Sequence, residues 1–142
     1  MRRSTVRVTC LLLPLAVFAW GCGDTQTSPT DTTSTPVPTI AETFADTLVL
    51  AGSNTHTFRS AAGAVTVQVL GVGPVSTLVI GVKVGTWSNG ACTAVLTNDA
   101  ATTGTMLLGT ATSPIDLCLN VYDVGNIQAG SSTTYSIQVV HP

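Results

Sequence analysis

Few side chains in this chain could carry out acid–base or metal chemistry. The only histidines are His56 and His141, and no Gly-x-Ser-x-Gly motif places a serine on a nucleophile elbow. Asp99, Asp116 and Asp123 each lie beside a turn or a strand end, where solvated loop carboxylates are expected rather than a paired general acid and base. No EF-hand spacing or repeat groups these acids for calcium. The sequence therefore predicts no catalytic residue, no metal site and no cofactor.

The N-terminus has the composition of an export signal. A basic stretch, residues 1–7, precedes an apolar run from Thr9 to Trp20. A membrane-spanning helix needs about 20 apolar residues, whereas the apolar region of a signal peptide needs only about 7 to 15. The run therefore fits a signal peptide and is short for a membrane span.

The end of this run could carry covalent lipid chemistry. The stretch Ala19-Trp20-Gly21-Cys22 resembles the bacterial lipobox, in which a small residue precedes a cysteine that is acylated and becomes the first residue of the mature protein. The resemblance implies a lipoprotein signal peptide over residues 1–21 and an acyl chain such as palmitate on Cys22. An ordinary secretory signal or a short uncleaved anchor is the alternative.

Two cysteines follow in the rest of the chain, Cys92 and Cys118. Export would place both in an oxidising compartment, where two cysteines of one small domain usually pair. Neither belongs to a Cys-x-x-Cys motif or has a histidine nearby, as a zinc site would require. We therefore predict a Cys92–Cys118 disulfide.

The composition separates a tether from a domain. Residues 23–41 contain seven threonines, two serines and three prolines, with almost nothing apolar to bury. Such a segment cannot offset its ordering entropy, so a disordered Thr/Ser/Pro-rich tether is predicted over residues 22–41. Residues 42–142 leave room for one domain of ordinary size.

The charge balance excludes two classes of partner. From Cys22 onward, Arg59 and Lys83 are the only basic residues against seven acidic ones, so the net charge is 2 − 7 = −5. Nucleic acids and anionic membrane surfaces require clustered lysine and arginine. Charged residues make up only 8% of the chain, well under the usual quarter, and its many threonines and valines favour strands over helices.

Short segments of alternating polarity recur through residues 42–142, separated by Gly, Asn, Pro and Ser. Val65, Val67 and Val69 share one face of such a segment, while Thr66 and Gln68 share the other. Strands are predicted at Phe44–Leu50, His56–Ser60, Val65–Val72, Thr77–Gly85, Cys92–Thr97, Thr105–Thr110, Ile115–Tyr122 and Tyr135–Val140. The spacing indicates an all-β domain: a single antiparallel β-sandwich of jelly-roll type with about eight strands.

Several of these segments resemble the bacterial pre-peptidase C-terminal (PPC) domain. The resemblance implies a β-sandwich of the kind often appended to secreted proteases and other exported enzymes, although no catalytic domain precedes it in this chain. Some relatives bind calcium or collagen through clustered acids, and no such cluster can be matched here. The matching stretches are Phe44 to Leu48, Gly52, His56-Thr57-Phe58, Ala62-Gly63-Ala64-Val65, Cys118-Leu119-Asn120-Val121-Tyr122-Asp123 and Tyr135-Ser136-Ile137.

A candidate ligand site follows from the expected disulfide. If Cys92 and Cys118 lie opposite each other on antiparallel strands, counting away from the bridge brings Trp87 and Tyr122 to one end of the sandwich. Aromatic faces beside amide and carboxylate groups would suit a sugar or a peptide. The predicted ligand-binding residues are Trp87, Asn89, Tyr122, Asp123 and Asn126. Alternatively, Trp87 caps the core and Tyr122 anchors a corner.

These observations predict a non-catalytic, membrane-anchored envelope lipoprotein that presents a β-sandwich binding or accessory module. Its partners would be the membrane, through the lipid anchor, and a glycan or protein ligand, but no nucleic acid. The expected location is the bacterial cell envelope, at the outer membrane or cell surface. The alternatives are a purely structural spacer or, far behind, a small exported hydrolase.

Overall fold

The computed structural model describes residues 37–142, and all of its regular structure is strand. The eight strands are β1 (Ile40–Val49), β2 (Ser53–Ser60), β3 (Gly63–Gly73), β4 (Ile80–Ser88), β5 (Ala91–Ala101), β6 (Met106–Ala111), β7 (Ile115–Tyr122) and β8 (Ser132–His141). No helix in this described part of the chain is long and apolar enough to cross a membrane. The predicted signal peptide, Cys22 and most of the predicted tether lie outside the described residues.

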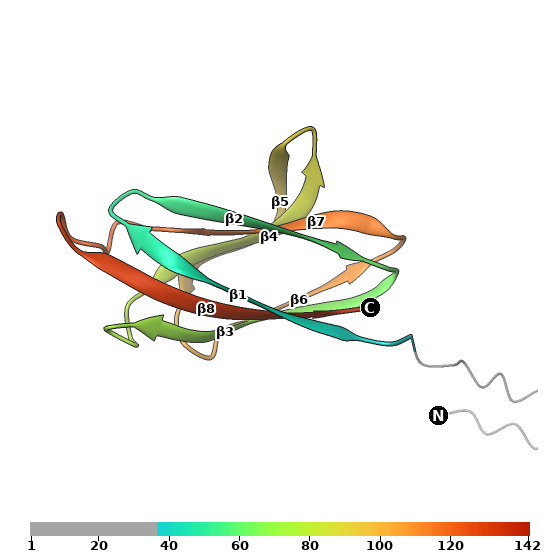
Figure 1. Cartoon of the computed structure of the whole chain (residues 1–142), viewed down its shortest axis with the longest axis horizontal. Coiled ribbons are helices and arrows are strands. Elements are labelled where there is room, and N and C mark those ends of the chain that lie inside the picture. Colours follow the sequence, from blue (N-terminus) through green and yellow to red (C-terminus); the bar gives the residue numbers. More distant parts are fainter. Residues whose placement is uncertain (1–36) are drawn as a thin grey trace, which may run out of the picture. The chain divides into compact units, whose positions relative to one another are not determined.

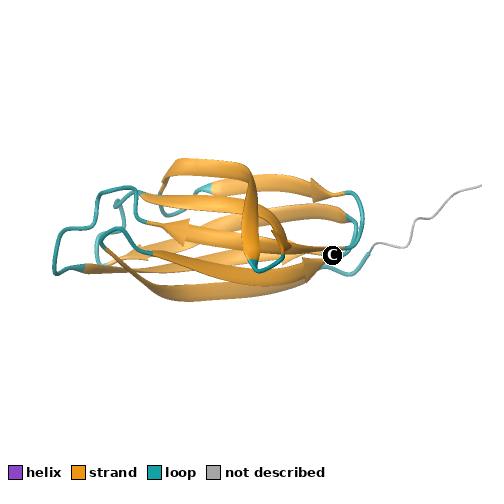
Figure 2. Ribbon diagram, turned by 90° about the horizontal axis from the view of Figure 1, so that it is seen from above, coloured by secondary structure: helices purple, strands orange, loops and turns teal. Residues whose placement is uncertain are grey.

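The strands form two four-stranded antiparallel sheets (Figures 1 and 2). Sheet A has the order β1-β8-β3-β6, and sheet B has the order β2-β7-β4-β5. Successive strands change sheet at every step except the β4–β5 hairpin, and the first strand pairs with the last. This is the jelly-roll arrangement, so the predicted fold class is confirmed.

Several predicted boundaries are wrong, and two of these errors concern the tether and β4. Ile40 and Ala41, assigned to the tether, begin β1 because they pair with His141 and Val140. The strand expected over Thr77–Gly85 runs instead from Ile80 to Ser88, since a turn closed by a hydrogen bond from Leu78 N–H to the Val75 carbonyl holds residues 75–78.

The core lies between the sheets and follows the alternation of the sequence. Val65, Val67 and Val69 of β3 are buried, as the period-two pattern predicts. Facing them, β4 buries Ile80 and Val82. Each such aliphatic side chain contributes about 1.5–3 kcal/mol on removal from water.

The two sheets differ in charge. In sheet A, strands β3, β6 and β8 contain no Asp, Glu, Lys or Arg. Every strand of sheet B carries one such residue. These residues are Arg59, Lys83, Asp99 and Asp116. The part of sheet A from β8 to β6 therefore carries no acidic side chain, lysine or arginine.

The predicted disulfide is confirmed, but it does not join neighbouring strands. Cys92 on β5 and Cys118 on β7 lie on either side of β4, with their Cα atoms 5.8 Å apart. The bridge crosses over Gly85, which pairs with Cys118, and an added Cβ there would overlap the carbonyl oxygen of Thr93. The β4–β5 hairpin bends away from sheet A as it crosses the outer face of sheet B (Figures 1 and 2).

Candidate functional site

The structure does not gather the five predicted ligand-binding residues. Trp87 pairs with Cys92, and Asn89 forms the hairpin turn that follows. Tyr122 instead pairs with Gly81, six residues before Trp87 on β4, and strands rise about 3.3 Å per residue. The structure therefore keeps Tyr122 and Asn126 together in one pocket but places Trp87 and Asn89 elsewhere, because the disulfide spans β4 and does not join adjacent strands.

Tyr122 is held by structural contacts on the outer face of sheet B. Its ring lies over Gly81, where an added Cβ would overlap it. Lys83 Nζ lies 4.1 Å from the ring centroid in a cation–π contact, and the phenol donates a hydrogen bond to Asp99. Burial, and then the Asp99 carboxylate, raise the pKa of Tyr122 to about 12, so the phenol stays protonated.

Asp123 and Asn126 hold loops together. Asp123 Oδ1 accepts hydrogen bonds from the N–H groups of Gly125, Asn126 and Ile127, and Oδ2 accepts one from Ala51 at 2.9 Å. Asn126 Nδ2 donates to the Val79 carbonyl at 3.0 Å. Burial raises the pKa of Asp123, but the four N–H donors outweigh it and lower the pKa below its ordinary value. These residues position the β7–β8 loop, as a structural role requires.

The two histidines are part of the packing between the sheets. His56 Nε2 lies 2.7 Å from the Tyr135 hydroxyl. The His56 ring stacks on the Phe44 ring, with the two ring centroids 5.0 Å apart. Burial lowers the pKa of His56, and the nearby Asp46 carboxylate acts in the opposite direction with the smaller effect. His141 is buried beside Phe58, with Nε2 3.2 Å from Glu42 Oε1. The described residues contain no group of three His, Cys, Asp or Glu side chains placed to hold a metal ion.

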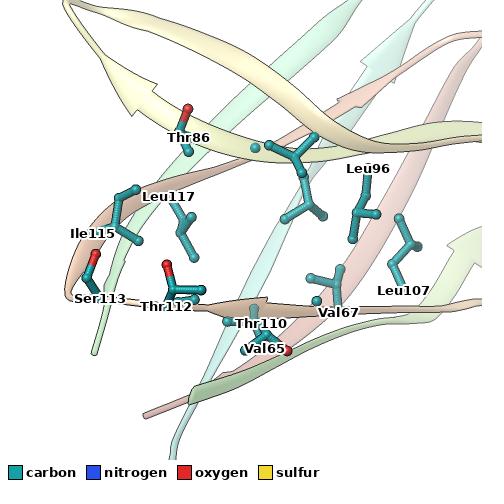
Figure 3. A pocket seen from close by; sticks show the side chains of 15 residues that line it. Val65, Val67, Thr86, Leu96, Leu107, Thr110, Thr112, Ser113, Ile115 and Leu117 are labelled. Carbon is teal, nitrogen blue, oxygen red and sulfur yellow. The ribbon is translucent and has the colours of Figure 1, made fainter. Parts of the chain in front are cut away.

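A different site, which the sequence analysis missed, lies between the two sheets at the side bounded by β5 and β6. It is an apolar cavity of about 220 Å³ that is open to solvent. Its walls come from both sheets, and Figure 3 shows Val67, Leu96, Leu107, Ile115 and Leu117 arranged around the shared space.

The cavity exists because one inner position lacks a side chain. The inward residues of β6 are Leu107, Gly109 and Ala111. Leu107 therefore places a large side chain in the space between the sheets, Ala111 places only a methyl group there, and Gly109 places no side chain. An added Cβ on Gly109 would contact Leu96 Cδ1 at 3.4 Å, and the backbone there has no positive φ. A side chain would therefore fit at this position, and glycine leaves the space open.

An exposed apolar side chain, Val95, lies at the opening of the cavity. The register of β4 and β5 shifts between Val84 and Gly85, which leaves Val95 as an unpaired bulge residue. Val95 is 71% exposed and lines the cavity. Bulges commonly redirect a side chain in this way. Of the cavity-lining residues, none is charged. The arrangement can take up an apolar group from outside without desolvating a charge.

Comparison with known proteins supports the fold alone. No protein-family model matches the chain, and no curated protein matches it. Among solved structures, it is similar to Aeromonas hydrophila PliG, a periplasmic lysozyme inhibitor of g-type lysozyme, with a TM-score of 0.51 and 18% sequence identity. The match covers 70% of this chain and 83% of PliG. The PPC resemblance stays a prediction.

Proposed function

We propose that this chain is a lipid-anchored envelope protein whose β-sandwich binds another protein without catalysing a reaction. The observation that carries the proposal is the open apolar cavity between β5 and β6, with Val95 exposed at its rim. Apolar concave sites are the usual binding sites of folded domains, and an apolar side chain in such a site is the usual anchor of a protein interface.

Two further observations support this proposal. PliG, which has the same fold, is described as an inhibitor of another protein, a g-type lysozyme. Trp87 and Asn89 lie apart from Tyr122 and Asn126, which line a separate, open pocket with Lys83 and Asp99, and the apolar cavity offers few polar groups to a glycan. A protein partner therefore fits the site better than the glycan ligand.

The anchoring part of the proposal rests on the sequence. A signal peptide over residues 1–21, acylated Cys22 and a tether ending before Ile40 would hold the domain at the outer membrane or cell surface. The disulfide supports export, because such bonds persist in oxidising compartments. We also propose that the domain belongs with PPC-like accessory modules.

Replacing Cys22 with serine tests the anchor. We expect the native protein to partition into detergent and to carry acyl mass on Cys22, and Cys22→Ser to release it into the soluble fraction. An unmodified, water-soluble native protein would contradict the lipoprotein proposal.

Filling the cavity tests the binding site. We expect Gly109→Val to leave the melting temperature equal or higher, because it fills a void, and to abolish saturable binding of the partner captured from envelope extract and then purified. Gly71→Ala is the matched control, since an added Cβ there has nothing within 4 Å. Purified g-type lysozyme is the first defined partner to assay. Unchanged affinity in Gly109→Val would show that the cavity does not bind the partner.

A further inference from the structure

Strand β6 presents an unpaired edge beside the cavity. Its six residues pair with β3 in unbroken register, from Gly63↔Ala111 to Gln68↔Met106. No other strand within residues 37–142 pairs with its opposite edge. A regular edge of this kind is a template for another strand.

The hydrogen bonds between β3 and β6 show which backbone groups of β6 point to its unpaired edge. Val69 N–H donates to the Thr105 carbonyl and Val69 carbonyl accepts from Gly104 N–H, so Val69 turns its backbone groups toward β6. Residues of an antiparallel pair alternate in this respect, so Val67 and Val65 bond to β6 in the same way. The N–H and C=O groups of Leu108 and Thr110 then point to the open edge.

The edge lacks the features that normally block strand addition. Lysine, proline and inward charges protect edge strands, and β6 reads Met-Leu-Leu-Gly-Thr-Ala. Met106 and Leu108 are 54% and 68% exposed on the outer face of the same strand. The neighbouring edge, β5, is a poor template because its register is irregular at two places and its hairpin bends away.

We infer that the partner binds by adding an extended segment to β6 as a fifth strand of sheet A, with one apolar side chain entering the cavity. The inference rests on the proposed function and specifies its partner: an uncharged segment with apolar residues at alternate positions. Backbone bonds to β6 would give affinity, and the side chain opposite Gly109 would give specificity. A cavity of about 220 Å³ exceeds the ~150 Å³ that holds a benzene ring, so one large side chain fits.

The test uses a fluorescent synthetic peptide as long as β6, with leucine or valine alternating with threonine and a lysine at each end for solubility. Its binding to the full chain in lipid nanodiscs is measured by anisotropy. Two further peptides serve as controls, one with the same composition but consecutive apolar residues, and one N-methylated on alternate amides. We expect the alternating peptide to bind at least tenfold more tightly than either control.

Protein variants separate the backbone contact from the cavity. Leu108→Pro removes an N–H at the open edge without breaking the β3–β6 ladder, and edge strands tolerate proline there. We expect Leu108→Pro and Gly109→Val each to weaken binding at least tenfold, with Gly71→Ala unchanged. If Leu108→Pro fails to fold, the N-methylated peptide on the unaltered protein decides.

Two results would overturn strand addition. In the first, the N-methylated peptide binds the unaltered protein, or the alternating peptide binds Leu108→Pro, as tightly as the alternating peptide binds the unaltered protein, while Gly109→Val abolishes binding. The cavity would then be a binding site without an added strand. In the other, no alternating peptide binds although the purified partner does. If Gly109→Val instead binds both the alternating peptide and the purified partner as tightly as the unaltered protein does, the proposed function is contradicted.

Discussion

At the residue scale, two glycines on β4 decide how the outer face of sheet B is built. Gly81 lies under the ring of Tyr122, and Gly85 lies under the backbone of Thr93. A tyrosine ring can move aside, whereas a backbone carbonyl fixed by a hairpin and a disulfide cannot. Gly85 is therefore the stricter requirement of the two.

Gly85→Ala is expected to destabilise the domain by about 3 kcal/mol or more, because its methyl group would overlap the Thr93 carbonyl. Gly71→Ala serves as the control and should change stability by less than about 1 kcal/mol. Urea unfolding of the two variants measures the difference. Equal urea midpoints for the two variants would show that the Thr93 carbonyl does not exclude a side chain at position 85.

Asp123 should make the domain sensitive to acid. Its pKa is lowered in the fold, so its contribution to stability is complete above the ordinary value of 3.8 and is lost as the pH falls through the lower folded value. Asp123→Asn presents an amide to Ala51 N–H and should cost about 1 kcal/mol at neutral pH. Thermal melts from pH 7 to pH 2 should show a flatter acid limb for the variant, and parallel curves would contradict the assignment.

The residue chemistry was only partly predictable from the sequence. The disulfide was predicted from the cysteine count and the expected export. The cavity was not predicted, because it depends on Gly109 facing Leu96 from the other sheet, and a missing side chain becomes a void only once the facing strand is known.

At the element scale, the disulfide fastens the β4–β5 hairpin to β7. All eight strands were predicted, since period-two burial is readable along the chain. The site geometry was not, because the sequence does not show that β4 lies between the two cysteine-bearing strands. The assumption that bridged strands are neighbours placed Tyr122 at the wrong end of β4.

Removing the bridge with a Cys92→Ser and Cys118→Ser double variant should lower stability by about 3.5 kcal/mol, since the closed loop spans a sequence separation of 26. Because β4 still pairs with both neighbours, the fold should persist at low temperature. Calorimetry gives the loss, and circular dichroism checks the fold. A melting temperature equal to that of the parent would mean that the bridge does not stabilise the domain.

At the scale of the whole molecule, the jelly-roll topology pairs β1 with β8 and so closes the chain on itself. We expect refolding of the domain in milliseconds to seconds, because sandwiches dominated by non-local pairing fold slowly. Stopped-flow fluorescence of Trp87, the one tryptophan of the domain, can measure this rate. Microsecond refolding would be incompatible with nucleation through such distant pairs.

If the proposed lipid anchor on Cys22 holds the protein by its N-terminus, the β1–β8 ladder also has a mechanical consequence. β1 is an edge strand with one hydrogen-bonded neighbour in sheet A, and its first pair, Ile40↔His141, stands where the chain enters the fold. Tension directed along the strand would load the whole ladder in shear, whereas tension directed across it would peel the pairs apart one after another. Resistance to forced unfolding is governed by the unfolding rate, so the lifetime of the domain under load would depend on the direction of the pull.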